Sequence, residues 1–275
     1  MTPANVSAED YVFGPASEIW QVNRYATGLL FGPAAVLLQV AHPRVAQGVA
    51  EHSDFRGDAL GRLKRTLTTV NSIAFGTRED AEYMRKRMTA VHQRGQGDTA
   101  EGVSGKPRYS AFEPDLLMWV LATLIDASFK GYEFVWGPLS LERREHFYRD
   151  FRKFGTYFGL GEGEGPQNHG EFVDYFDSIL ASDLLGSHPL CAEVAAAVVR
   201  PPAPLHNRLL GMLVDFLPIE TISFTLRERL LLRSTYSTRG RMAMLRALAP
   251  HAFHILPKRL TYYPEAYRAE HALRR

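Results

Sequence analysis

The stretch Leu116-Leu-Met-Trp-Val-Leu-Ala-Thr-Leu-Ile125 is the most apolar helical segment of this 275-residue chain. It follows Glu113-Pro114, and proline is favoured at the first position of a helix. We therefore predict one long helix from this point through about Tyr132. Helical periodicity also dominates on both sides, whereas strand-like alternation with Asn-Gly or Asp-Gly hairpin turns is absent. The pattern predicts an all-α fold in one globular multi-helix domain over residues 1–275.

The segments before this helix carry clear start and stop signals. Proline predicts a helix opened at Gly32-Pro33 and broken at His42-Pro43. Gly76 is a stop signal, and Thr77 followed by acidic residues is typical of a cap. The Gly-rich, polar segment from Gly95 to Pro107 predicts a mobile loop. The further helices expected in this half are Ala16–Tyr25, Arg44–His52, one from the 53–58 turn through Phe75, and one that carries His92 near its end.

The second half shows weaker helical signals after the glycine-rich breaker Gly159–Pro166. This breaker could be a domain boundary, but apolar helices lie on both sides of it, which favours a single domain. One helix is expected before this breaker, from Ser140 to near Gly159. The weaker helices expected after it cover Gly170–Leu180, Pro189–Val199, Asn207–Leu217 and Leu226–Leu248.

Composition excludes several classes of protein. The net charge of +2 is too small to indicate a nucleic-acid partner. The single cysteine, Cys191, excludes an intrachain disulfide and a cysteine-rich metal site. The apolar run from Gly28 to Ala41 is shorter than the roughly 20 residues that cross a bilayer. The N-terminus lacks the basic and apolar regions of a secretory signal, so we expect a cytoplasmic protein without a transmembrane segment.

Common catalytic motifs are also missing from the sequence. It contains neither a Gly-x-Ser-x-Gly elbow nor a Walker-type Gly-Lys-Ser/Thr. Neither a Glu-x-x-His pair nor a His-Glu-x-x-His helix occurs, which argues against a di-iron bundle and a zinc protease. Glu162 and Glu164 in the glycine-rich breaker would repel a phosphate, so it is a poor nucleotide cradle.

A polar stripe on one predicted helix is the first candidate site. Arg62, Arg65, Thr66 and Thr69 stand at i, i+3, i+4 and i+7, so they share one face beside an apolar stripe. Buried guanidinium groups need carboxylates or other acceptors, and a bound anion or haem propionates would serve. The alternative is a set of surface cations on an amphipathic helix. Few acidic residues lie nearby, which weakens that alternative.

Histidines supply candidate ligands. His92 follows one helix later and could be an axial ligand, although a lone helical histidine is more often an ordinary surface or core residue. His42 precedes Pro43, where the helix breaks, and could satisfy carbonyls freed there. Glu51 and His52 end the next segment and could be capping or pocket residues.

Several ordered motifs resemble one known family, which includes the rubber oxygenase (latex-clearing protein) and the fungal MpaB-type oxygenases. The resemblance is dense over residues 25–150 and loose elsewhere. It implies an all-α fold that binds haem b through an axial histidine and uses dioxygen to cleave an alkene. The matching motifs are Leu-Leu-Gln-Val-Ala-His-Pro (37–43), His-Ser-Asp-Phe (52–55), Gly-Arg-Leu-Lys-Arg-Thr (61–66), Ala-Phe-Gly-Thr (74–77), Val-His-Gln-Arg-Gly-Gln-Gly (91–97), Tyr-Ser-Ala (109–111) and Leu-Met-Trp-Val-Leu-Ala-Thr (117–123).

The resemblance also implies roles for single residues. His92 matches the axial ligand of the iron, and Arg62 and Thr66 match polar residues of an Arg-x-x-Lys-Thr motif. Arg65 stands where the family carries a distal lysine. A guanidinium is a poor iron ligand, so we expect the distal side to be open or water-filled. Arg62, Arg65, Thr69 and His42 are expected to help bind haem, while Arg62, Arg65 and Thr66 act on the oxygen species.

Two functions remain open at this point. The first is a haem b-dependent oxygenase or oxidoreductase that acts with dioxygen on a small apolar or unsaturated substrate, with Trp119 and its helix lining the pocket. A rubber polymer is not expected, because no export signal is present. The second is a non-enzymatic all-α protein that holds an anionic or apolar ligand without haem. Neither a nucleic acid nor a membrane span is expected, and a homo-oligomer is left open.

Overall fold

The computed structural model describes residues 7–52, 59–103, 107–199 and 216–274, with only the backbone for residues 59–64. These residues form helices with one short hairpin, so the predicted all-α fold is confirmed. The elements are a 3-10 helix Ala8–Asp10, α1 Glu18–Asn23, α2 Gly28–Ala41, α3 Pro43–His52, α4 Ala59–Phe75, α5 Arg78–His92, β1 Gln96–Asp98, β2 Arg108–Ser110, α6 Pro114–Trp136, α7 Leu141–Thr156, α8 His169–Ala181, α9 Pro189–Val199, α11 Leu217–Thr221, α12 Phe224–Arg229, α13 Tyr236–Ile255, α14 Lys258–Thr261 and α15 Pro264–Ala272.

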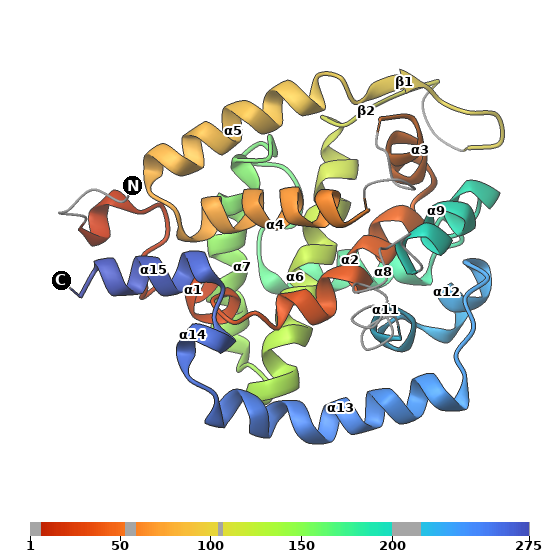
Figure 1. Ribbon diagram of the computed structural model, residues 1–275. Helices are drawn as coiled ribbons and strands as arrows, with labels where there is room; N and C mark the ends of the chain where they lie inside the picture. Colours follow the sequence, from red (N-terminus) through yellow and green to blue (C-terminus); the bar gives the residue numbers. More distant parts are fainter. Residues whose placement is uncertain (1–6, 53–58, 104–106, 200–215, 275) are drawn as a thin grey trace.

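Helix α6 runs through the middle of the molecule and packs along α2 (Figure 1). The indole Nε1 of Trp119 donates a hydrogen bond to the carbonyl of Leu38 at 3.1 Å, and its ring stacks on Phe176. Trp119 is 1% exposed. It therefore locks α6 to α2 inside the core, and the predicted role of this side chain as an open pocket wall is not supported.

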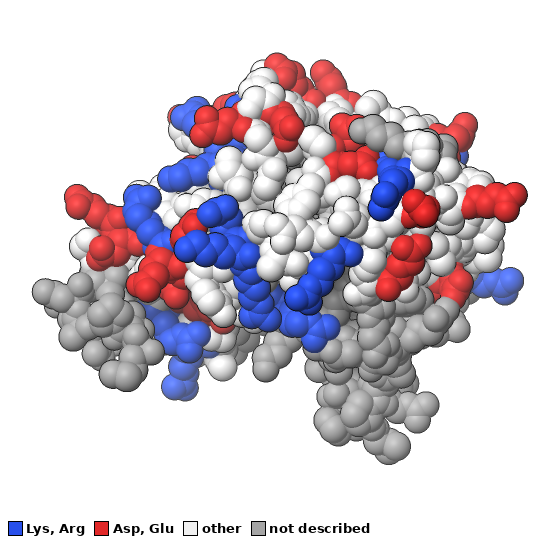
Figure 2. Space-filling model, turned by 90° about the horizontal axis from the view of Figure 1, so that it is seen from above, with Lys and Arg blue, Asp and Glu red and all other residues white. Residues whose placement is uncertain are grey.

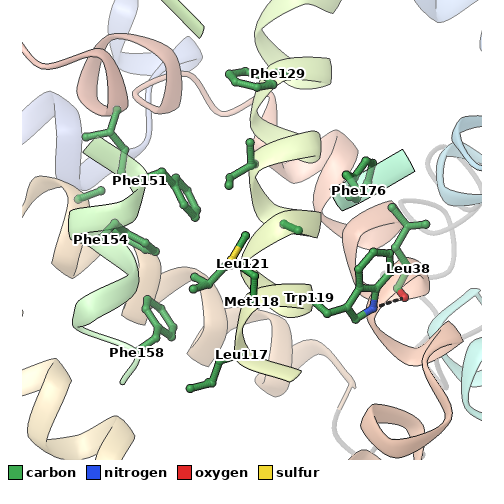
Figure 3. Close-up of a cluster of buried hydrophobic side chains, with 14 of the residues drawn as sticks. Leu38, Leu117, Met118, Trp119, Leu121, Phe129, Phe151, Phe154, Phe158 and Phe176 are labelled. Atoms are coloured by element: carbon green, nitrogen blue, oxygen red, sulfur yellow. Dashed lines mark hydrogen bonds between the residues drawn. The ribbon is translucent and has the colours of Figure 1, made fainter. Parts of the chain in front are cut away.

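Aromatic side chains of α7 cover another face of α6 (Figure 3). Phe147, Phe151 and Phe154 stand at i, i+4 and i+7, which places them on one side of the helix, and Phe158 follows in the turn beyond its end. All four are buried. Burying a phenylalanine side chain contributes about 1.5–3 kcal/mol, so this row is a major part of the core that holds the site elements in place.

The corner between α2 and α3 differs from the prediction at one proline. Helix α2 begins at Gly28 and contains Pro33, whereas the sequence predicted a start at Gly32-Pro33. Pro33 cannot donate to the carbonyl of Leu29, but Leu29 is exposed, so solvent can satisfy that carbonyl. Pro43 does break the helix as predicted, and α3 leaves α2 at a bend of 104°.

The helices of the C-terminal part also differ from those predicted. The single helix predicted over Leu226–Leu248 is in fact α12 and α13, separated where Leu231 adopts a φ of 55° and Thr235 caps α13. Helix α13 then continues through Pro250 to Ile255, followed by α14 and α15, which were not predicted. The predicted helix over 207–217 lies mostly outside the described residues.

Residues 96–98, at the start of the segment predicted as a mobile loop, form β1, which pairs antiparallel with β2 just after that segment, so that Gly97 lies opposite Tyr109. Its strands are three residues each, too short for alternation to reveal them. In the described part of the chain, no single helix has both the length and the apolar composition that a membrane span requires; α2 and α3 would reach them only together, across their bend.

Candidate functional site

The β1–β2 hairpin connects the end of α5 to the start of α6 and decides where His92 lies. The carbonyl of Gly95 accepts a hydrogen bond from the backbone N–H of Ala111 at 2.7 Å, so the returning strand closes beside the helix end. The next residue, Phe112, then meets the imidazole of His92 edge to face, with ring centroids 5.5 Å apart. Two segments twenty positions apart in the chain thus form one corner.

His92 is half-buried, and its surroundings keep it neutral. Burial lowers the pKa of its imidazole. Its Nδ1 is fully enclosed and has no hydrogen-bond partner among the described residues. An unsatisfied buried polar atom costs about 1–3 kcal/mol and calls for an explanation such as a ligand. In the described part of the chain, no hydrogen bond to Nδ1 therefore orients this ring.

Three polar side chains, those of Glu51, His52 and Tyr109, meet where the same hairpin contacts α3. The buried hydroxyl of Tyr109 donates a short hydrogen bond to the carboxylate of Glu51 and lies 2.9 Å from Nε2 of His52. A phenol carries one proton, so with that proton given to Glu51, Nε2 of His52 must be the donor to the phenolic oxygen. Burial, together with the hydrogen bond to Glu51, raises the pKa of Tyr109. The phenol therefore stays protonated at neutral pH.

Gln47 and Gly97 hold this group in place. The amide of Gln47 donates to Glu51 and to the carbonyl of Asp98, both at 2.7 Å, and accepts from the backbone N–H of Ala100 at 3.1 Å. A Cβ on Gly97 would come within 3.0 Å of Glu51 Oε2 and of the Tyr109 ring. The close approach of strand to helix therefore requires glycine at this position.

His42 occupies the α2–α3 corner and is almost completely buried. Its Nδ1 accepts a hydrogen bond at 3.3 Å from the backbone N–H of Arg44, a donor of the first turn of α3. Burial and the neighbouring Arg44 lower its pKa to about 4. The guanidinium of Arg44 in turn makes a two-pronged ion pair with Glu113, at 2.6 and 2.5 Å. His42 therefore satisfies a freed amide, where the sequence suggested freed carbonyls.

The predicted stripe on α4 is only partly described. Arg65 and Thr66 are exposed, and the hydroxyl of Thr69 donates to the carbonyl of Arg65 at 3.0 Å. The side chain of Arg62 lies outside the described residues. Helix α4 packs against α5, so this stripe and His92 are on neighbouring helices. His42 has different partners from both, and its predicted part in binding a cofactor stays a prediction.

The structure adds Arg44 and Gln47 to Glu51, which the sequence already suggested as a capping or pocket residue. Arg44, Gln47 and Glu51 stand at i, i+3 and i+7 of α3, and this polar stripe on a short amphipathic helix was the available signal. Tyr109 was noticed only as part of a matching motif. Its pairing with Glu51 and His52 depends on the hairpin, which the sequence pattern does not show.

Two cavities lie elsewhere. One of 540 Å³ is lined by residues of α5, α7 and the turn after it, including Arg85, Arg152 and Lys153. The other, of 390 Å³, lies between the start of α6 and α8 and is lined by Asp115, Met118, Tyr175 and their neighbours. Neither is lined by the residues predicted to bind haem.

Comparison with known proteins places the chain among oxygenases. The family described as ER-bound oxygenase mpaB/B'/Rubber oxygenase, catalytic domain, matches residues 20–252. Uncharacterised proteins of Mycobacterium bovis and Mycobacterium tuberculosis are each 30% identical over 152 residues, which cover 54% of this chain and 58% of the relative. The chain thus aligns with little more than half the length of these relatives. No solved structure is significantly similar to it.

Proposed function

The chain belongs to the mpaB and rubber oxygenase catalytic-domain family, and on that premise we propose that it is a haem b-dependent oxygenase. Its substrate, in this proposal, is a small apolar or unsaturated molecule that reacts with dioxygen. The observation that carries the proposal is His92, a neutral imidazole with an enclosed nitrogen that has no partner among the described residues.

The residues present fit a haem group. Iron in haem needs one neutral imidazole from the protein, and the lowered pKa of His92 supplies it. A multi-residue metal cluster is not needed, and the described residues offer no group of three or more metal-ligating side chains. Arg65 and Thr66 are exposed on the helix that packs against α5, so they are accessible to a ligand.

In this proposal each residue of the candidate site has a specific role in binding haem or acting on oxygen. His92 would hold the iron, and the edge of Phe112 would keep its ring in position. The cationic side chains of Arg62 and Arg65 would bind a propionate or stabilise negative charge on oxygen, and Thr66 would donate a hydrogen bond there. Thr69 gives its hydroxyl proton to the carbonyl of Arg65, so it would shape this turn of α4. Bound haem would supply the activation of dioxygen, which these side chains lack.

The test is the absorption spectrum of the purified full chain after expression with haem supplied. We expect a Soret band, and we expect His92→Ala to abolish or shift it. The matched control is His146→Ala, because His146 is an exposed helical histidine on α7. A protein that stays colourless after attempted reconstitution contradicts the proposal. An unchanged band in His92→Ala contradicts the assignment of the ligand.

Arg65 can be tested separately in the haem-bound protein. Replacing it by lysine restores an amine that can coordinate metal, so Arg65→Lys should give a six-coordinate spectrum if this side chain faces the iron. Arg78→Lys is the control, because Arg78 is exposed at the far end of α5. An unchanged spectrum in Arg65→Lys places the residue away from the iron.

A second function, ligand binding without haem, is favoured by one observation. In the 540 Å³ cavity, Arg152 and Lys153 donate to backbone carbonyls, including those of Glu162 and Val12. These cations could hold an anionic ligand. A colourless protein that binds an anionic dye, with binding lost in Arg152→Gln, would support this function over the oxygenase.

A further inference from the structure

Helix α13 lies along one edge of the molecule, on the opposite side from α5 (Figure 1). It is 20 residues and hence about 30 Å long. Its buried residues, Thr238, Met242 and Ala249, share one narrow face that rests on the protein, chiefly on α6 and α11. The rest of the helix surface is turned outward.

The outward face carries several large apolar side chains. Tyr236, Met244, Leu248 and Ile255 fall within about a third of the helix circumference, away from the buried face. They are 89%, 60%, 59% and 82% exposed. Leu256 and Leu260, just beyond the helix, are exposed as well. We call this set of six the outer stripe. Large exposed apolar side chains gathered on one face mark an interaction surface.

The charge around the outer stripe has one sign. The chain contains no Asp or Glu between Glu228 and Glu265, while Arg233, Arg239, Arg241, Arg246, Lys258 and Arg259 fall in that interval. Arg239 is exposed beside Tyr236, with its guanidinium carbon 4.7 Å from the centroid of that ring, and Lys258 and Arg259 are exposed between Leu256 and Leu260. By contrast, the face over α5 carries both signs of charge (Figure 2).

We propose that the outer stripe of α13 and its flanking cations bind the surface of an anionic lipid bilayer. A helix that lies in the membrane interface has this composition: apolar side chains enter the acyl boundary while Arg and Lys reach the lipid phosphates. Tyr236 at one end adds an aromatic ring of the kind enriched at that depth. The proposal does not depend on whether the chain binds haem.

The charges favour this partner over a second copy of the chain. Two copies joined through this face would bring the cations of one against those of the other, with no carboxylate from residues 229–264 to compensate them. Like charges brought together across an interface oppose binding. Nucleic acid would match the cations, but it would leave the large aliphatic side chains of the stripe without an apolar partner.

The experiment is flotation of the purified full chain with lipid vesicles. We expect the chain to float with vesicles of phosphatidylcholine mixed with phosphatidylglycerol, to float much less with phosphatidylcholine alone, and to dissociate as salt rises. Circular dichroism and the melting temperature check that each variant is folded, which we expect because the substituted residues are exposed.

Two double variants separate the apolar and the charged contributions. Leu248→Glu with Ile255→Glu should weaken binding at least about tenfold, because carboxylates would enter the interface. Arg239→Gln with Arg259→Gln should weaken it roughly tenfold. The matched controls lie on α5, where Tyr83→Glu and the pair Lys86→Gln with Arg87→Gln make similar changes at exposed positions and should leave binding unchanged.

Three results would overturn the proposal. The first is a wild-type chain that does not float with anionic vesicles. The second is equal binding by Leu248→Glu/Ile255→Glu and by the wild type. The third is a wild-type dimer in sedimentation velocity that this double variant converts to monomer, because a second copy of the chain would then cover the outer stripe.

Discussion

Two corners of the molecule each carry a neutral histidine, buried at His42 and half-buried at His92, but the two differ in one hydrogen bond. At the α2–α3 corner, Nδ1 of His42 accepts from the backbone of Arg44. At the corner between α5 and the hairpin, Nδ1 of His92 is enclosed and has no partner among the described residues. Burial lowers the pKa of both imidazoles.

This difference in hydrogen bonding indicates a structural role for His42 and a candidate binding role for His92. A buried imidazole that caps a helix is fully accounted for by the stability of the fold. One with an enclosed, unpaired nitrogen costs stability, so its presence is explained better by a ligand. The proposed function therefore assigns cofactor binding to His92, while His42 has a structural role at its corner. Four experiments test this difference between the two corners.

The largest effect is expected at the α2–α3 corner. Glu113→Gln removes the charge that pairs with Arg44, whose side chain is 9% exposed. A buried charge left without its partner should lower the free energy of unfolding by about 3–5 kcal/mol, measured by urea denaturation. The control Glu82→Gln breaks an exposed ion pair with Arg85 and should change little. Equal effects of the two variants would mean that the corner is not held by its buried charges.

The next largest effect is a change in how the free energy of unfolding depends on pH. The pKa of His42 is about 4 in the folded chain and 6.5 as its ordinary value, so the unfolded chain binds more protons between these limits. Its contribution to stability is then complete above pH 6.5 and is lost as the pH falls toward 4, by about 3 kcal/mol. Urea unfolding across this range should show a shallower pH dependence for His42→Asn, in which the amide oxygen can still cap α3. Parallel curves for the two proteins would contradict the lowered pKa.

A smaller change in the free energy of unfolding is expected for a substitution in the β1–β2 hairpin. Gly97→Ala places a Cβ 3.0 Å from Glu51 and the Tyr109 ring, and such overpacking costs about 1–3 kcal/mol. Gly32→Ala is the control, because nothing lies within 4 Å of its added Cβ in α2. That change should instead stabilise the helix by up to about 1 kcal/mol. If both variants gain stability, the hairpin does not press against α3 as described.

The smallest effect compares the two histidines directly in the haem-free protein. His42→Leu removes a cap and should cost about 0.5–2 kcal/mol. His92→Leu removes an unpaired buried nitrogen and should be neutral or slightly stabilising, within about 1 kcal/mol. Both values come from urea denaturation at neutral pH. A loss in His92→Leu as large as that in His42→Leu would show that Nδ1 of His92 has a structural partner.

Local signals in the sequence predicted much of the fold. The Thr77–Asp80 capping box, the Gly76 stop and the Pro43 break are each decided by a few adjacent residues, and α3, α4 and α5 follow them. Predictions failed where distant contacts compete with local preference. Pro33 stays inside α2 because that helix is buried against α6, and the three-residue strands form because the end of α5 and the start of α6 converge.

The candidate site also combines features that the sequence predicted with features that depend on contacts between distant segments. Periodicity within single helices predicted the helical class, whereas His92 as the candidate ligand came from the resemblance of several ordered motifs to one family. Only the tertiary structure decided that Tyr109 joins Glu51 to His52, that Arg44 is buried against Glu113, and that His42 has a partner while His92 has none in the described chain. The physical reason is that a hydrogen bond depends on distance and burial, which folding sets between segments far apart in the chain.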